Sequence, residues 1–218
     1  MSAKLGVAAY AEAFRTQNGP AALRRLILSA RGNVLAYALA ALHAYMTQAS
    51  DYNFLGQNLM ERITGAVFEK GNPNVAKHAL GIVNLMTRAD SPSQGAVIFM
   101  GKKKLELPVG ELLSMLESSD SQMQAGALEL VNNLLHHVPE AEQADDAFRR
   151  QLLDAGLHRV LKVLCSTPEK ALRAELRRYQ LNELVLRTRA RQTPFDEAEP
   201  AHMRLLEELW AAVFPEQP

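Results

Sequence analysis

The sequence has little of what marks secreted, metal-binding or nucleic-acid-binding proteins. Its 218 residues include one cysteine and one tryptophan, and 24 basic residues are balanced by 24 acidic ones. A single cysteine excludes a disulfide within the chain and a four-cysteine metal site. A net charge of zero removes the general attraction to phosphate on which nucleic-acid-binding domains depend. We therefore expect no nucleic acid among its partners, no metal and no cofactor.

Long apolar runs are missing too. The first six residues contain no apolar segment of signal-peptide length, and no stretch approaches the ~20 uninterrupted apolar residues of a membrane span. Cys165 ends the apolar segment 160–165, where we expect a buried and unreactive side chain. Adjacent His136 and His137 diverge by roughly 100° on a helix, which does not suit a metal site. These absences predict a cytoplasmic, non-enzymatic protein.

What the sequence does contain is helix. Leucine and alanine dominate, and alternating strand-like runs are absent. Asn72-Pro73, Ser91-Pro92 and Thr167-Pro168 place a capping side chain before a proline, and residues 119–122 (SDSQ) fit a capping box. The predicted helices span residues 3–17, 20–31, 33–49, 53–70, 73–89, 92–103, 107–118, 120–138, 140–154, 157–166, 168–191 and 200–214.

Three of these helices nearly repeat one another, in residues 38–43 (ALAALH), 79–84 (ALGIVN) and 127–132 (ALELVN). The copies recur every ~40–50 residues, each after a break and another apolar helix, which is typical of stacked armadillo/HEAT repeats. We predict an all-α fold, an armadillo/HEAT-like right-handed α-solenoid of about four helical repeats. Residues 1–191 are expected to form this repeat domain, and residues 192–218 an acidic hinge and a C-terminal capping helix.

The last residues of the three copies, His43, Asn84 and Asn132, are candidate partner-binding residues. In armadillo proteins an asparagine at this place lines the concave face and grips a partner's backbone, because its side chain offers a donor and an acceptor together. Where peptide-binding members carry tryptophan, four residues earlier, this chain has leucine (Leu39, Leu80 and Leu128). Two interpretations stay open: the asparagines bind a partner, or they hydrogen-bond the adjacent helix.

A run of arginines in the last long helix of the repeat domain is the second candidate surface. Arg173 and Arg177 have the i,i+4 spacing of one helix face, and Arg178 follows directly. Such a run is either solvated surface, a site for an acidic partner such as a small GTPase or an exchange factor, or a contact to anionic lipid headgroups.

With its repeats laid out, the chain resembles the armadillo-like helical domain of the engulfment and cell motility (ELMO) family of cytosolic scaffolds. The resemblance rests on four stretches: residues 34–46, 72–83, 112–124 and 173–186. It implies protein partners, namely Rho-class or Arf-class small GTPases or DOCK-type exchange factors, and a link from engulfment (phagocytosis) or motility signals to the actin cytoskeleton. The helical region of diaphanous-type formins is similar and also serves Rho GTPases.

The leading hypothesis is therefore a non-enzymatic, ELMO-like scaffold in small-GTPase signalling, recruited to membranes peripherally if at all. A formin-type GTPase-binding repeat module is the nearest alternative. An enzyme on a helical-repeat frame, such as a base-excision glycosylase, would need a basic, aromatic-lined groove with a catalytic carboxylate. Zero net charge and one tryptophan argue against that enzyme. A self-associating structural fragment is a further alternative.

Overall fold

The computed structural model describes residues 8–48, 52, 54–88, 99–100, 102–136, 147–192 and 200–213. Within these ranges the chain is helical and has no strand, which confirms the all-α class. The elements are α2 (Ala8–Thr16), α3 (Gly19–Ser29), α4 (Gly32–Met46), α5 (Gln57–Val67), α6 (Pro73–Thr87), η1 (Lys104–Glu106), α8 (Val109–Leu116), α9 (Ser121–His136), α10 (Ala147–Asp154), α11 (Leu157–Leu164), α12 (Lys170–Gln192) and α13 (Pro200–Val213).

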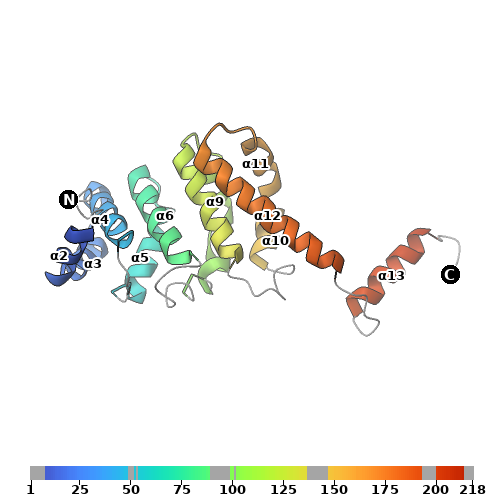
Figure 1. The fold of residues 1–218 in the computed structure, drawn as a ribbon, viewed down its shortest axis with the longest axis horizontal. Helices are drawn as coiled ribbons and strands as arrows, with labels where there is room; N and C mark the ends of the chain where they lie inside the picture. The colour runs from blue at the N-terminus through green and yellow to red at the C-terminus, as the bar shows by residue number, and fades with distance from the viewer. Residues whose placement is uncertain are drawn as a thin grey trace. The chain divides into compact units, whose positions relative to one another are not determined.

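The chain divides into two compact units, Met1–Gln180 and Leu181–Pro218. In the first unit α4, α6 and α9 stand side by side in chain order (Figure 1), and each packs against the helix that precedes it in its pair, α3, α5 or α8. We call α4, α6, α9 and the part of α12 in this unit the inner helices. The predicted stack of two-helix repeats is thus confirmed for these three pairs.

The core of the stack forms where the repeated segments meet. The small residues Ala38, Ala79 and Ala127, which begin the three repeated segments, are all buried and allow the inner helices to approach closely. Larger apolar side chains at helical spacing fill the space around them, including Leu39, Leu42, Leu80, Val83, Leu128 and Val131. Each such leucine or valine stabilises the fold by ~1.5–3 kcal/mol. No repeat can bury its apolar faces alone, so the repeats stabilise one another.

Capping side chains set the helix starts. Asn72 accepts a hydrogen bond from the Asn74 backbone N–H at 3.1 Å, and Pro73 begins α6, as predicted. The prediction of a capping box at residues 119–122 is wrong. Asp120 caps α9 instead, because its carboxylate accepts hydrogen bonds from the backbone N–H groups of Gln122 and Met123. A charged acceptor beside the positive end of a helix dipole outcompetes a serine hydroxyl.

Cys165 is exposed, so the prediction of a buried thiol is wrong. It directly follows α11, whose buried face is already filled by Leu157, Val160, Leu161 and Leu164. One further residue turns ~100° away from that face. Most of the predicted helix 92–103, His137 and most of the predicted acidic hinge lie outside the described residues.

The second unit, Leu181–Pro218, contains the last part of α12 and α13. Several large apolar side chains of this unit are exposed, among them Leu181, Leu184 and Leu205. No described helix combines the length and the apolar content that a membrane span needs. The domain boundary predicted at residues 191/192 remains a prediction.

Candidate partner-binding surface

The three repeat-end residues occupy matching places on successive inner helices, and each side chain points toward the next inner helix along the chain. His43 is on α4, Asn84 on α6 and Asn132 on α9. This side-chain contact from one inner helix to the next thus occurs three times, with a different set of partner groups each time. The stack therefore brings these residues into one row.

The imidazole of His43 lies against the α6 backbone at Gly81. A Cβ atom added to Gly81 would be 2.8 Å from His43 Cε1 and 2.9 Å from its Nε2. A glycine at this place in α6 gives the ring its room. Burial, and secondarily the nearby His78, lower the pKa of His43, and burial followed by Lys77 lowers the pKa of His78. In both cases burial favours the neutral form of the ring.

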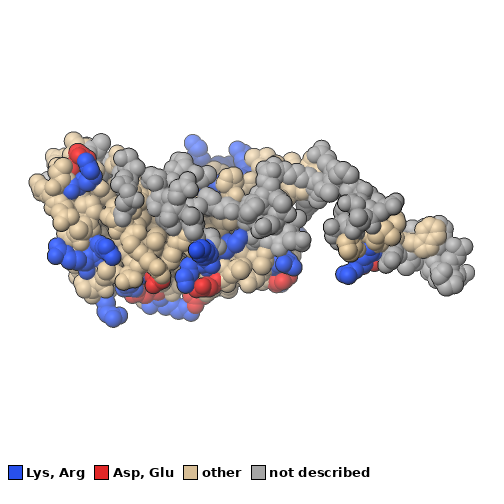
Figure 2. All heavy atoms as spheres, turned by 90° about the horizontal axis from the view of Figure 1, so that it is seen from below, with Lys and Arg blue, Asp and Glu red and all other residues tan. Residues whose placement is uncertain are grey.

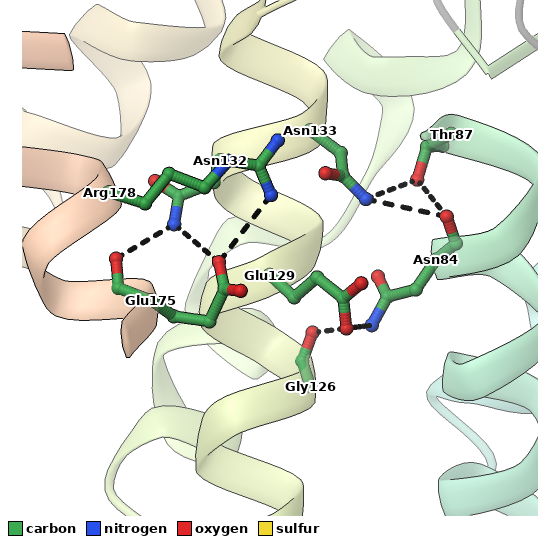
Figure 3. A network of polar contacts seen from close by, with 8 residues as sticks. All are labelled: Asn84, Thr87, Gly126, Glu129, Asn132, Asn133, Glu175 and Arg178. Carbon is green, nitrogen blue, oxygen red and sulfur yellow. Dashed lines mark hydrogen bonds and ion pairs between the residues drawn. The ribbon is translucent and has the colours of Figure 1, made fainter. Parts of the chain in front are cut away.

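Asn84 ties α6 to α9 (Figure 3). Its side-chain Nδ2 donates to the backbone carbonyl of Gly126 at 2.9 Å and to Glu129 Oε2 at 3.1 Å. A second asparagine returns the contact, because Asn133 Nδ2 on α9 donates to Thr87 Oγ1 at 3.1 Å and to the Asn84 carbonyl at 3.4 Å. Two opposed amide groups thus fix the register between these inner helices.

Asn132 repeats the arrangement between α9 and α12. Its Nδ2 donates to the backbone carbonyl of Glu175 at 3.0 Å and to Glu175 Oε2 at 2.9 Å. The same carboxylate oxygen lies 3.5 Å from Arg178 Nη1 (Figure 3). The structure thus brings Asn132 and Arg178, two of the predicted site residues, to one carboxylate that the sequence did not single out.

The asparagines therefore hydrogen-bond the adjacent helix, as the second interpretation predicted. Asn84 is 4% exposed and Asn132 fully buried, and each directs its amide nitrogen at two acceptors. The paired acceptors fix the amide orientation, since a flipped amide would face oxygen with oxygen. The Oδ1 atoms of Asn84, Asn132 and Asn133 are buried with no hydrogen-bond partner. Partner binding by His43, Asn84 and Asn132 remains a prediction.

Two carboxylates accompany this row, Glu129 on α9 and Glu175 on α12. Burial and the Glu175 carboxylate raise the pKa of Glu129, whereas Arg88, Arg178 and the hydrogen bond from Asn84 oppose that rise. Each carboxylate accepts from an asparagine, so acidic groups and amide donors alternate along the row. We call this row, with its amide donors and carboxylate acceptors, the polar seam.

The predicted arginine cluster is split by helix geometry. Leu172, Leu176 and Tyr179 form the buried face of α12, and Glu175 with Arg178 forms the face toward α9. Arg173 and Arg177 each lie two residues from Glu175, hence ~160° around the helix, and both are exposed. Lys170 lies on that same exposed face, since residues 170, 173 and 177 share the i, i+3, i+7 spacing. We call Lys170, Arg173 and Arg177 the basic stripe.

The described residues supply no acidic partner to the basic stripe, although other basic residues of the chain have one. On the face shown in Figure 2, basic side chains stand in small separate groups, and acidic side chains lie beside several of them. In the part of the chain that the structure describes, no three His, Cys, Asp or Glu residues group together to hold a metal ion.

The sequence gave His43, Asn84 and Asn132 equivalent positions in the repeats but did not identify the groups that they contact. Glycines 81 and 126 lie inside helices, where glycine costs ~1 kcal/mol relative to alanine. Because such a cost needs a compensating reason, these two glycines were the sequence signal for a close contact. Glu129 and Glu175 gave no such signal, because carboxylates are ordinary on exposed helix faces.

These features define a helical-repeat protein whose inner helices are joined by side-chain hydrogen bonds from one repeat to the next. A sequence profile of the ELMO armadillo-like helical domain matches residues 9–164. The chain therefore belongs to the ELMO armadillo-like helical domain family, as the resemblance implied.

Two curated relatives come from Dictyostelium discoideum. The chain is 30% identical over 102 residues to ankyrin repeat and ELMO domain-containing protein D, a match that covers 47% of this chain and 8% of the relative. It is 24% identical over 194 residues to Formin-G, covering 83% of this chain and 17% of that protein. The chain thus spans less than a fifth of either relative.

Solved structures agree on the fold. Two crystal structures of engineered proteins superpose with TM-scores of 0.58 and 0.60 at 19% and 18% identity. The matches cover 81% and 83% of this chain, and 67% and 41% of the respective engineered chains. Identities this low show a shared architecture alone.

Proposed function

We propose that this chain is a non-enzymatic interaction module whose basic stripe binds the acidic surface of a Rho-class or Arf-class small GTPase, in signalling to the actin cytoskeleton. Membership of the ELMO armadillo-like family supports the general role. The observation that carries the specific proposal is the stripe itself. Its three cations share one exposed face of α12 and have no acidic partner among the described residues.

The seam between α9 and α12 supports this role because it holds the stripe in place. Asn132 fixes the backbone of α12 at Glu175 and also binds the Glu175 side chain. The stripe projects from the other side of the same helical turns. A rigid helix loses little conformational entropy on binding, so a pre-positioned set of cations discriminates well among acidic surfaces.

Titration of the purified chain with Rho-class and Arf-class GTPases, each loaded with GDP or a GTP analogue, tests the proposal. We expect binding to one class that weakens as salt is raised, because exposed charges are screened. The double variant Arg173→Glu with Arg177→Glu should weaken it by about tenfold or more, since each exposed ion pair contributes ~0.2–1 kcal/mol and reversal adds repulsion.

The matched control reverses the charge of two exposed arginines elsewhere, Arg25→Glu with Arg31→Glu. It changes the net charge equally and leaves the stripe intact. Arg178 is unsuitable as a test position because its guanidinium lies beside the Glu175 carboxylate. Binding that the control weakens as much as the stripe variant, or no binding to any GTPase, contradicts the proposal.

A further inference from the structure

A groove lies between two repeats and shares no lining residue with the polar seam. It encloses about 680 Å³ and is walled by the outer helices α8 and α11, with the first turn of α9 contributing Gln124. Its lining is mostly aliphatic, and it includes Leu113 and Leu116 from α8 and Val160 and Val163 from α11. All of its lining residues are described and belong to the first unit.

Each wall contributes a regular helix face to this hollow. From α8 and its C-cap, Gly110, Leu113, Leu116 and Glu117 line it, at relative positions 0, 3, 6 and 7. From α11 and its N-cap the lining positions are 156, 159, 160, 163 and 164, which again follow the helical repeat. Such faces interdigitate with the ridges of a third helix, as helices do in cores.

One side chain at the lip is exposed without a structural reason within the described chain. Val163 is 77% exposed, although α11 is otherwise strongly divided into an apolar and a polar face. An aliphatic side chain at that exposure contributes almost nothing to the fold. Burial of the Val163 side chain by an apolar partner would therefore contribute hydrophobic free energy to binding.

The two walls carry opposite charges. Glu117 lines the α8 side and Arg159 the α11 side, where its guanidinium lies over Gly156, and neither has an ion pair among the described residues. A helix lying between the walls would meet a carboxylate along one flank and a guanidinium along the other. A partner helix with one basic and one acidic flank is complementary to both.

We propose that this groove binds an amphipathic α-helix of a partner protein, with an aliphatic stripe facing Val163 and Leu113, a basic flank toward Glu117 and an acidic flank toward Arg159. The volume also falls within the ~300–1,000 Å³ range of small-molecule pockets, but those sites place convergent polar groups around one ligand. Here the polar groups stand on opposite walls, and helix-in-groove binding uses that layout. The proposal is independent of the GTPase role, which uses another helix.

Three synthetic helical peptides test it against the full chain. All carry leucine at i, i+3, i+7 and i+10, and they differ in having one lysine flank and one glutamate flank, two lysine flanks, or two glutamate flanks. Because a helix can enter in either direction, uniform flanks are the informative controls: each places one like charge against a wall. We expect the mixed peptide to bind about fivefold or more tightly than either uniform peptide at low salt.

Two variants sharpen the test. Val163→Asp should weaken the mixed peptide by about tenfold or more, whereas Val34→Asp, at another exposed valine on α4, should not. Glu117→Lys makes both walls basic and should move the preference to the peptide with two glutamate flanks. Both positions are exposed, so the fold should survive, and circular dichroism checks this.

Equal affinity for the three peptides, no binding, or binding that Val163→Asp leaves unchanged overturns the proposal. The remaining possibility is that a second copy of this chain occupies the groove. Sedimentation of the chain without peptide tests this by measuring its oligomeric state. A dimer that Val163→Asp dissociates would mean that a second copy fills the groove, and would also overturn it.

Discussion

The ring of His43 packs onto α6 where Gly81 has no side chain, and a Cβ atom at Gly81 would lie 2.8 Å from His43 Cε1. Among the described residues, this contact joins the first two inner helices through shape and not through a hydrogen bond of the imidazole. It also makes a glycine inside a helix useful, although glycine is a poor helix former.

Gly81→Ala should therefore destabilise the protein by ~1–3 kcal/mol, because the added methyl group would displace the His43 imidazole from its packed position. The matched control is Gly65→Ala in α5, where nothing lies within 4 Å of the added Cβ. That change should stabilise by ~0.5–1 kcal/mol through helix propensity. Urea unfolding of both variants decides the matter. Recovery of stability in Gly81→Ala with His43→Ala would identify the ring as the cause, and equal effects at both glycines would contradict the contact.

Asn132→Asp should cost more than Asn132→Ala. Alanine removes both hydrogen bonds to Glu175, a loss of ~1–3 kcal/mol, although Arg178 still lies beside Oε2. Aspartate instead places a carboxylate against those acceptors, which adds repulsion and a buried charge. Asn74→Asp, in the exposed first turn of α6, should be neutral or stabilise by ~0.3–1 kcal/mol. Guanidinium unfolding at constant pH measures all three; an Asn132→Asp variant no weaker than alanine would refute the assigned amide orientation.

Stability should fall as the pH drops below about 6.5, the ordinary pKa of histidine. Burial lowers the pKa of His43 and His78, so the unfolded chain takes up these protons first and is favoured in acid. Each histidine contributes a slope of at most ~1.4 kcal/mol per pH unit. Unfolding curves between about pH 5.5 and 7.5 should show this slope, and His43→Asn should reduce it.

Glu129 acts with the opposite sign. Its raised pKa means that the folded state holds its proton more tightly, so this contribution is present below the ordinary pKa of 4.5 and is lost as the pH rises through the folded value. Because wild type and His43→Asn both contain Glu129, its contribution cancels when their free energies of unfolding are subtracted. A pH-independent difference would show that His43 is not buried as described.

Asn72→Ala should destabilise by ~1 kcal/mol through loss of the α6 cap. Asn72→Asp keeps an acceptor for the Asn74 N–H and gives up only the exposed bond from Asn72 Nδ2 to Asn33 Oδ1. It should therefore lie close to wild type in a thermal melt. Equal losses for alanine and aspartate would assign the effect to the Asn33 contact instead.

The architecture could be predicted because it rests on local pattern. The repeats around Ala38, Ala79 and Ala127 mark the inner helices directly, and Asn72-Pro73 marks a helix start. Cys165 and Asp120 could not be placed in the same way. Whether Cys165 is buried depends on where α11 ends, and which side chain caps α9 depends on a competition between neighbouring acceptors.

The candidate site was harder, because its partners lie one repeat away. Asn84 and Asn132 were recognised from their place in the repeat, but Gly126, Glu129 and Glu175 meet them across 42 to 45 residues of chain. Which arginines of residues 173–178 face outward was equally undetermined until the position of Glu175 fixed the rotation of α12.

The amide contacts of Asn84 and Asn132 run in one direction, each inner helix reaching for its successor. Each of these two helices thus depends on the next one for its acceptors. A chain cut before α12 would expose the Asn132 amide to water, and solvent would then replace both of its protein acceptors.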